Sequence, residues 1–204
     1  MLIKLKSKMK ILKLLTAAII ALTLLNKNSF ALEAEDKNKY VIEPYHTSVL
    51  WVANHFGFSD VSGKFTEIEG NIIFDEKNPS KSAVDVVIKI SGLKTGIEKF
   101  DAHLKSADFF DEKRFLTAKF VSKKVTVSGK NKAKIEGELT LLGVTKTVVL
   151  DARFNKSGVS VLNQKPTIGF SATASIKRSD FGMNYALPGV SDKVSLVIQV
   201  EANN

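Results

Sequence analysis

Apolar and polar residues alternate with a period of two through much of the chain after residue 40. The alternation is clearest at residues 84–90, 135–141, 148–154, 168–176 and 194–200. Because successive side chains of a strand point to opposite faces, this pattern is typical of strands with one buried and one wet face. Antiparallel sheets commonly have that arrangement, whereas parallel sheets are usually buried on both faces. The pattern therefore predicts an all-β, antiparallel domain.

Further strands are predicted at residues 47–57, 64–75 and 117–128. Clusters of turn-forming residues are expected to separate the strands, and they lie at residues 60–63, 78–80, 128–131 and 155–158. The total is about eight strands, the number found in a closed barrel or a sandwich. One interruption, residues 97–104, is predicted to be helical because Ile97, Phe100 and Leu104 recur at i, i+3 and i+7.

The first 31 residues are organised like an export signal. Lysines precede an apolar run at residues 14–25, and Ser29-Phe30-Ala31 provides the small residues that a signal peptidase requires. The run is shorter than the roughly 20 apolar residues of a spanning helix. We therefore predict cleavage after Ala31, export to a bacterial periplasm and a mature domain of residues 32–204. An uncleaved membrane anchor is the alternative.

The net charge of +9 is concentrated in that leader, which contains six lysines and no acid. The rest of the chain has 24 lysines and arginines against 21 acids, so little charge remains to neutralise phosphates. We therefore expect no nucleic-acid partner. The chain contains no cysteine, which excludes a disulfide scaffold, a thiolate zinc site and a cysteine nucleophile.

Several predicted inner faces mix large and very small side chains, such as Gly137 beside Leu139 and Ala53 near Trp51. Small inward residues either let two sheets pack closely or leave space inside a barrel. An eight-stranded barrel is the size that can hold one small ligand. The spacing alone therefore leaves both a filled core and a ligand cavity open.

The histidines are the first candidates for chemistry. His46, His55 and His103 could ligate zinc, but they show no short ligand spacing. His55 lies on the same alternating face as Trp51, which is typical of a hydrogen-bonded core residue. Asp101 and His103 are two residues apart on the predicted helix and should not face each other.

Arg178 is the second candidate, because the chain contains only three arginines. Its planar guanidinium can hold a carboxylate or a phosphate through two parallel hydrogen bonds. The structural alternative is an ion pair with Asp180 or Asp101 that closes one end of the barrel. No nucleophile elbow, phosphate-binding glycine loop or His-Glu-x-x-His motif is found in the sequence. We therefore expect a protein without catalytic residues, metal or cofactor.

The combination of motifs resembles the YceI-like family of exported polyisoprenoid-binding proteins. The most specific are the run Asp101-Ala102-His103-Leu104-Lys105-Ser106-Ala107-Asp108 and the run Leu139-Thr140-Leu141-Leu142-Gly143-Val144-Thr145-Lys146. The other matching segments are residues 40–47, 55–57, 61–65, 95–96, 109–111, 137–138 and 178–183. The resemblance implies an eight-stranded, lipocalin-like antiparallel barrel with a long apolar tunnel. It also implies a bound isoprenoid lipid of the quinone or polyprenyl type, or a fatty acid derivative.

On this basis we expect the lipid tail and its head group to contact different residues. The tail is expected along Val49, Trp51, Phe74, Val86, Ile88, Leu139, Phe170 and Ile198. The head group is expected near His55, Asp101, His103, Arg178 or Asp180. Two further interactions stay open at this point: transient contact with a membrane, and formation of a homodimer.

Two other functions remain open. The chain could be an enzyme or a metal-dependent sensor that uses His46, His55 and Asp101. It could also be a structural or partner-docking barrel with a solid core, which would have no ligand-sized cavity and would expose an apolar patch instead.

Overall fold

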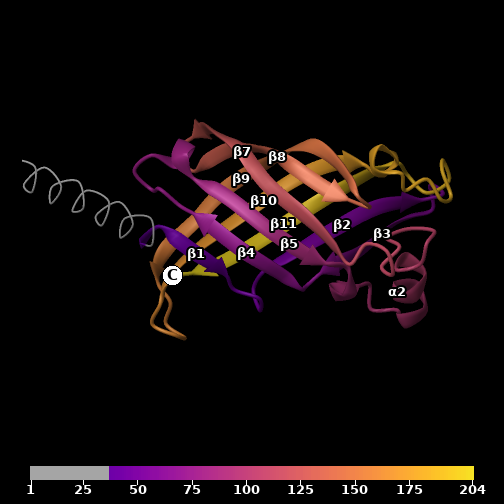
Figure 1. Ribbon diagram of the computed structural model, residues 1–204, viewed down its shortest axis with the longest axis horizontal. Helices are drawn as coiled ribbons and strands as arrows, with labels where there is room; N and C mark the ends of the chain where they lie inside the picture. The colour runs from indigo at the N-terminus through magenta and orange to yellow at the C-terminus, as the bar shows by residue number, and fades with distance from the viewer. Residues whose placement is uncertain (1–36) are drawn as a thin grey trace, which may run out of the picture. The chain divides into compact units, whose positions relative to one another are not determined.

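Antiparallel strands form the body of the protein and cross it obliquely (Figure 1). The computed structural model describes residues 37–204, and residues 39–204 form one unit. The strands are β1 (Lys39–Ile42), β2 (Ser48–His55), β3 (Ser59–Phe65), β4 (Ile68–Ile73), β5 (Ala83–Lys89), β6 (Leu93–Lys94), β7 (Thr117–Gly129), β8 (Lys132–Leu141), β9 (Val144–Val159), β10 (Pro166–Lys177) and β11 (Lys193–Asn203). The helix is α2 (Glu98–Leu104), and three 3-10 turns are η1 (Pro79–Lys81), η2 (Ile90–Gly92) and η3 (Arg178–Phe181).

The barrel closes because β11 pairs with both β1 and β2. β1 and β2 are two parts of one interrupted strand, and they pair with β4 and β3 respectively. β3 and β4 therefore form a second interrupted strand. β5 and β6 form a third, in which β5 pairs with β4 and β6 pairs with β3. The described segments thus occupy eight positions around the ring. The predicted eight-stranded antiparallel barrel with one short helix is confirmed.

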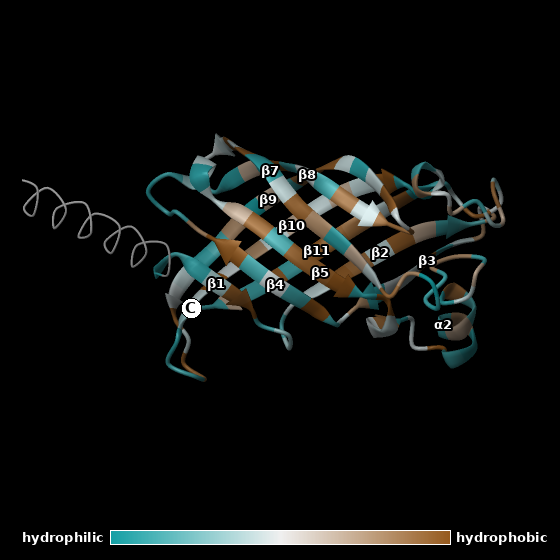
Figure 2. Cartoon of the chain, viewed as in Figure 1, coloured by the Kyte–Doolittle hydropathy of each residue, from teal (hydrophilic) through white to brown (hydrophobic). Residues whose placement is uncertain are grey.

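Alternation along each strand separates the inner from the outer face (Figure 2). In β8, Ala133, Ile135, Leu139 and Leu141 are partly or fully buried, whereas the intervening lysines and glutamates are exposed. The buried residues form two clusters, one around Trp51, Phe120 and Leu139 and the other around Ile72 and Ile168. The period of two read from the sequence therefore marks the two sides of the barrel wall.

The turn predicted at residues 60–63 is wrong, because these residues lie inside β3. The chain reverses earlier, where Phe56 and Gly57 have φ of 52° and 77° and the Phe58 amide donates to the His55 carbonyl. Consecutive positive φ values suit a tight hairpin. Gly57 is the one usual turn residue of this hairpin, because phenylalanine seldom occupies such a position.

The turn predicted at residues 155–158 is also wrong, since β9 continues to Val159. The register between β9 and β10 shifts by one residue between the pairs Lys156–Gly169 and Phe154–Phe170. Asn155 is therefore the extra residue of a β-bulge, and its side-chain amide donates to Ser171 Oγ at 2.9 Å. The turns predicted at 78–80 and 128–131 fall where strands end, as expected.

The predicted signal peptide and its cleavage point after Ala31 lie outside the described residues. Within residues 37–204, no helix has the length and apolar character needed to span a bilayer.

Two inward glycines make room for aromatic rings on neighbouring strands. A Cβ at Gly137 would lie 2.4 Å from Phe120 Cζ and 2.6 Å from the Val121 carbonyl oxygen. A Cβ at Gly63 would lie 2.6 Å from Trp51 Cζ2. Neighbouring rings therefore occupy the space beside these two glycines, so the glycines do not create empty space.

We predict that Gly137→Ala destabilises the barrel by about 1–3 kcal/mol, because the added methyl group overpacks the Phe120 contact. Gly158→Ala is the control, since its Cβ meets only Lys156 Cε at an ordinary 3.7 Å. The free energy of unfolding from urea denaturation measures both changes. Equal stability of the two variants would contradict the assigned role of Gly137.

Candidate functional site

Two adjoining cavities lie inside the barrel. The turn-end cavity, of about 400 Å³, reaches the β7–β8 turn at Lys130 and Asn131. The helix-end cavity, of about 380 Å³, reaches Phe100 and His103 of α2. Four side chains line both cavities and mark the waist between them: Val49, Ile88, Leu139 and Leu196.

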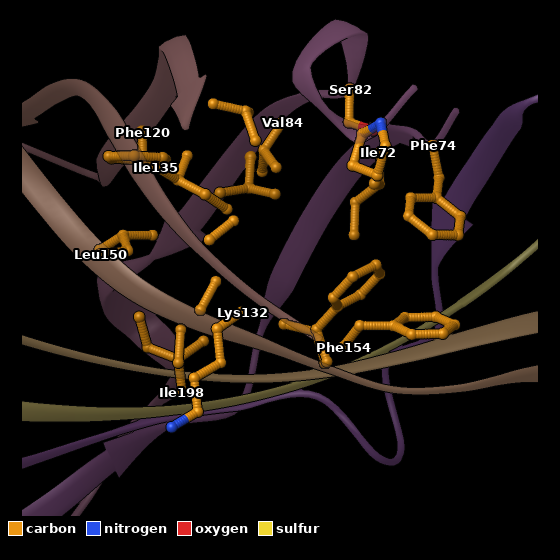
Figure 3. Close-up of a pocket in the computed structure, with 18 of the residues that line it drawn as sticks. Ile72, Phe74, Ser82, Val84, Phe120, Lys132, Ile135, Leu150, Phe154 and Ile198 are labelled. Carbon is orange, nitrogen blue, oxygen red and sulfur yellow. The ribbon is translucent and has the colours of Figure 1, made fainter. Parts of the chain in front are cut away.

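The wall of the turn-end cavity is almost entirely apolar (Figure 3). Phe74, Phe154 and Phe170 form an aromatic cluster on it, with ring centroids 5.2–5.4 Å apart. Polar side chains line its rim, where the segment between β4 and β5 contributes Glu76 and Ser82 and the β7–β8 turn contributes Lys130 and Asn131. This arrangement suits a ligand with a long apolar portion.

A row of alanines opens this cavity. Ala133, Ala152 and Ala172 are register partners on the adjacent strands β8, β9 and β10, and all three line the turn-end cavity. Three neighbouring inner positions thus carry only a methyl group.

The helix-end cavity is covered by an aromatic cluster. The rings of His103, Phe109 and Tyr185 pack edge to face with centroids 5.1–5.5 Å apart. These residues belong to α2, to the loop that follows it and to the loop between η3 and β11. His103 Nε2 also lies 3.1 Å from Asp108 Oδ2.

Arg178 is buried in the wall of the helix-end cavity, with only 3% of its surface exposed. Its Nε, Nη1 and Nη2 donate to the carbonyls of Ser191, Met183 and Val190, each at 2.9 Å. Burial lowers the pKa of Arg178, and the nearby carboxylate of Asp192 partly opposes this shift. A guanidinium has five N–H donors, so three carbonyls leave part of its capacity unused.

The ion pairs considered from the sequence for Arg178 do not form. Asp180 is exposed and lines neither cavity. Asp101 also lies outside both cavities, where it accepts hydrogen bonds from the Thr95 amide at 2.7 Å and the Thr95 hydroxyl at 2.5 Å. The hydrogen bond from the Thr95 hydroxyl is the largest effect and lowers the pKa of Asp101. Burial opposes this shift less strongly, and the Thr95 amide adds a smaller lowering. Asp101 therefore fastens α2 to the end of β6.

This contact predicts an acid-sensitive attachment of α2. Because the pKa of Asp101 is lower in the folded state, its contribution to stability is present above the unfolded value near 3.8 and lost as the pH falls through the folded value. Asp101→Asn should therefore reduce the loss of stability below about pH 4. Urea denaturation between pH 2 and pH 6 measures this slope. An unchanged slope would contradict the role given to the Thr95 contact.

The three histidines do not converge on one site. His46 contacts Glu43 and Glu201, His103 contacts Asp108, and His55 packs against Phe56 at a centroid distance of 4.8 Å. The set of His46, His55 and Asp101 proposed for a metal or catalytic centre is therefore not assembled in the described residues.

All eight residues expected along the lipid tail line one or both cavities. Of the five residues expected near a head group, His55, His103 and Arg178 line the helix-end cavity, whereas Asp101 and Asp180 line neither. Trp51 Nε1 is the only buried side-chain donor or acceptor of the described residues that has no hydrogen-bond partner. The sequence did not indicate that Lys130 and Lys132 line the rim of the turn-end cavity, although a turn was predicted at residues 128–131.

The YceI-like domain matches residues 40–202 of this chain. A UPF0312 protein of Pseudomonas putida (strain W619) is 38% identical over 160 residues, which cover 78% of this chain and 82% of that protein. The chain belongs to the YceI-like family. The resemblance inferred from the motifs is thus confirmed.

Two solved structures have the same architecture. A Campylobacter jejuni YceI protein is 36% identical with a TM-score of 0.66, covering 74% of this chain and 89% of that one. A polyisoprenoid-binding domain from Saccharophagus degradans is 13% identical with a TM-score of 0.62, covering 80% and 97%. At that identity the second structure shows a shared fold alone.

Proposed function

We propose that this protein is a non-catalytic carrier that holds a long isoprenoid lipid, of the quinone or polyprenyl type or a fatty acid derivative, inside its barrel. The observation that carries the proposal is the pair of adjoining apolar cavities. Each has a volume within the roughly 300–1,000 Å³ of small-molecule sites. A solid-core docking barrel would have no such space.

The energetics favour a long apolar tail. Each methylene moved from water to an apolar wall contributes roughly 0.8 kcal/mol. A tail that extends from one cavity through the waist into the other would gain this contribution along its whole length. The shared walls at Val49, Ile88, Leu139 and Leu196 support this continuous path.

The head group is proposed to lie at the helix end. The polar side chains that line that cavity include His55, His103 and Arg178. Trp51, in the same wall, carries a buried indole N–H without an acceptor, and leaving such a donor unpaired costs about 1–3 kcal/mol. A ligand with a carbonyl or hydroxyl oxygen at this end would suit these donors better than a pure hydrocarbon.

The name of the Saccharophagus degradans domain also supports an isoprenoid ligand, through the shared fold. We further propose that the carrier works in a bacterial periplasm, because residues 1–31 read as a cleavable export signal. The enzyme or sensor alternative is less well supported, since its residues His46, His55 and Asp101 have separate partners.

Ala172→Phe should block the turn-end cavity and weaken binding of a long-chain quinone. If the ring displaces four methylenes of the tail, the cost is about 3 kcal/mol, or roughly a hundredfold in Kd. Thr173→Phe is the matched control, because Thr173 is exposed on the outer face of the same strand. Quenching of Trp51, the single tryptophan of the chain, reports binding, and native mass spectrometry identifies any lipid that purifies with the protein.

Equal affinity of the two variants would contradict a tail in the turn-end cavity. A wild-type protein that neither purifies with a lipid nor takes up a quinone or a polyprenol would contradict the carrier function itself.

Transient membrane contact is proposed at the β2–β3 turn. Phe58 is 90% exposed there, and its neighbour Phe56 lines the helix-end cavity. An aromatic side chain that inserts into a bilayer gains about 1.5–3 kcal/mol, so a lipid could enter near this turn while Phe58 holds the protein at the surface.

Phe58→Ser should therefore slow quinone transfer from vesicles by roughly tenfold without changing the affinity for the ligand. Val161→Ser is the control, since Val161 is 86% exposed in the β9–β10 turn, at the opposite end of the barrel in Figure 1. Stopped-flow quenching of Trp51 measures the transfer rate. Equal slowing by both variants, or none by Phe58→Ser, would contradict this docking surface.

A further inference from the structure

We propose that Glu43, His46 and Glu201 form a binding site for a divalent transition-metal ion, of which Zn²⁺ is the best fit, on the outer wall of the barrel. The site lies where the bend between β1 and β2 meets β11. It is separate from the two cavities and does not depend on the lipid-binding proposal. It also differs from the His46, His55 and Asp101 set considered from the sequence.

The spacing of the donor atoms suits one ion. The ligand atoms of the three side chains all lie within 4.8 Å of one another. His46 Nδ1 lies 2.9 Å from Glu43 Oε2 and 3.8 Å from Glu201 Oε2. Ligands 2.0–2.1 Å from a tetrahedral zinc are roughly 3.3 Å apart, a value between these two distances. Small side-chain rotations would therefore bring all three donors to bonding distance, with water as a fourth ligand.

The main chain holds the site in place before any ion binds. Glu43 accepts hydrogen bonds from the amides of Tyr45 and His46, at 3.1 and 2.8 Å. The Thr47 hydroxyl donates to the Glu201 carbonyl and accepts from the Glu201 amide, each at 3.1 Å. The Glu43 amide also donates to the Glu201 carbonyl at 2.9 Å. The bend and β11 are thus fixed against each other.

The charge of the cluster favours a cation. Burial alone raises the pKa of Glu43, but the hydrogen bonds from His46 and Tyr45 outweigh it and lower the pKa, so this carboxylate stays ionised. No lysine or arginine of residues 39–204 forms an ion pair with Glu43 or Glu201. The side chains of His46 and Glu201 are 53% and 47% exposed, which leaves the donors accessible from solvent.

An ion at this site would fasten the interrupted part of the barrel wall. β11 pairs with β2 through Gln199 and with β1 from Ala202 onward, and the bend occupies the gap between them. Ile42 and Thr47, at the two ends of the bend, line the turn-end cavity on the inner side. Metal binding outside would therefore stiffen one part of the cavity wall.

The chain provides its own control. His103 and Asp108 form a second exposed histidine–carboxylate pair, at 3.1 Å, but no second carboxylate of residues 37–204 joins them. If any such pair bound zinc, the two places would bind alike. If the triad is required, only His46 and Glu201 should matter.

The test is a titration of the untagged, chelator-treated chain with ZnCl₂ by isothermal calorimetry, with Co²⁺ absorption as a second probe of the ligand set. We expect one Zn²⁺ per chain, with a Kd that rises by at least about tenfold in His46→Ala and in Glu201→Gln and is unchanged in His103→Ala. Glu43 is left intact because its carboxylate also supports the bend. Circular dichroism checks that the substituted chains fold.

Three results would overturn the proposal. One is the absence of Zn²⁺ binding up to about 1 mM. Another is wild-type affinity in both His46→Ala and Glu201→Gln. The third is an equal loss of affinity in His103→Ala, which would show that zinc binds surface histidines in general.

Discussion

Closure of the sheet is the constraint on which the rest of this structure depends. A closed ring satisfies the backbone of every strand and forces one face of each strand toward a common interior. Closure is not uniform here, because β11 pairs with β2 from Ser195 to Gln199 and with β1 at Ala202 and Asn203. Thr47 bridges that change of partner through both main-chain groups of Glu201. The Thr47 hydroxyl and the Glu43 amide, which also donates to the Glu201 carbonyl, therefore connect the two sides where the regular ladder is interrupted.

Small inward residues are used in two different ways, and only one of them leaves the interior open. Gly63 and Gly137 lie beneath the rings of Trp51 and Phe120, so their missing side chains are replaced by aromatic volume. The alanine row of β8, β9 and β10 lines the turn-end cavity instead. Protein interiors otherwise pack densely, and an unfilled volume costs stability. Filling that volume with a lipid tail would recover the lost contacts, which links the choice of alanine to binding.

The sequence predicted what repeats locally and missed what depends on partners far along the chain. Alternation located the strands and the tunnel-facing residues, because a period of two fixes the face of each side chain. It could not show that Asn155 marks a bulge or that Asp60 pairs with Asn54 across a hairpin, since both follow from register. The partners of Arg178 are main-chain carbonyls of the loop between η3 and β11, and no residue type signals them. Glu201 meets His46 only because the barrel closes.

The buried guanidinium of Arg178 makes the two ends of the barrel interior chemically different. Removing a cation from water is costly unless polar groups surround it, and the three carbonyls around Arg178 supply that environment at the helix end alone. The turn end has no buried charge, since its lysines lie exposed at the rim. A lipid that entered with its polar group toward the turn end would leave hydrocarbon against Arg178 and the indole N–H of Trp51. The opposite orientation places polar atoms beside donors and hydrocarbon beside alanine and phenylalanine, and is therefore the orientation that the wall of the barrel favours.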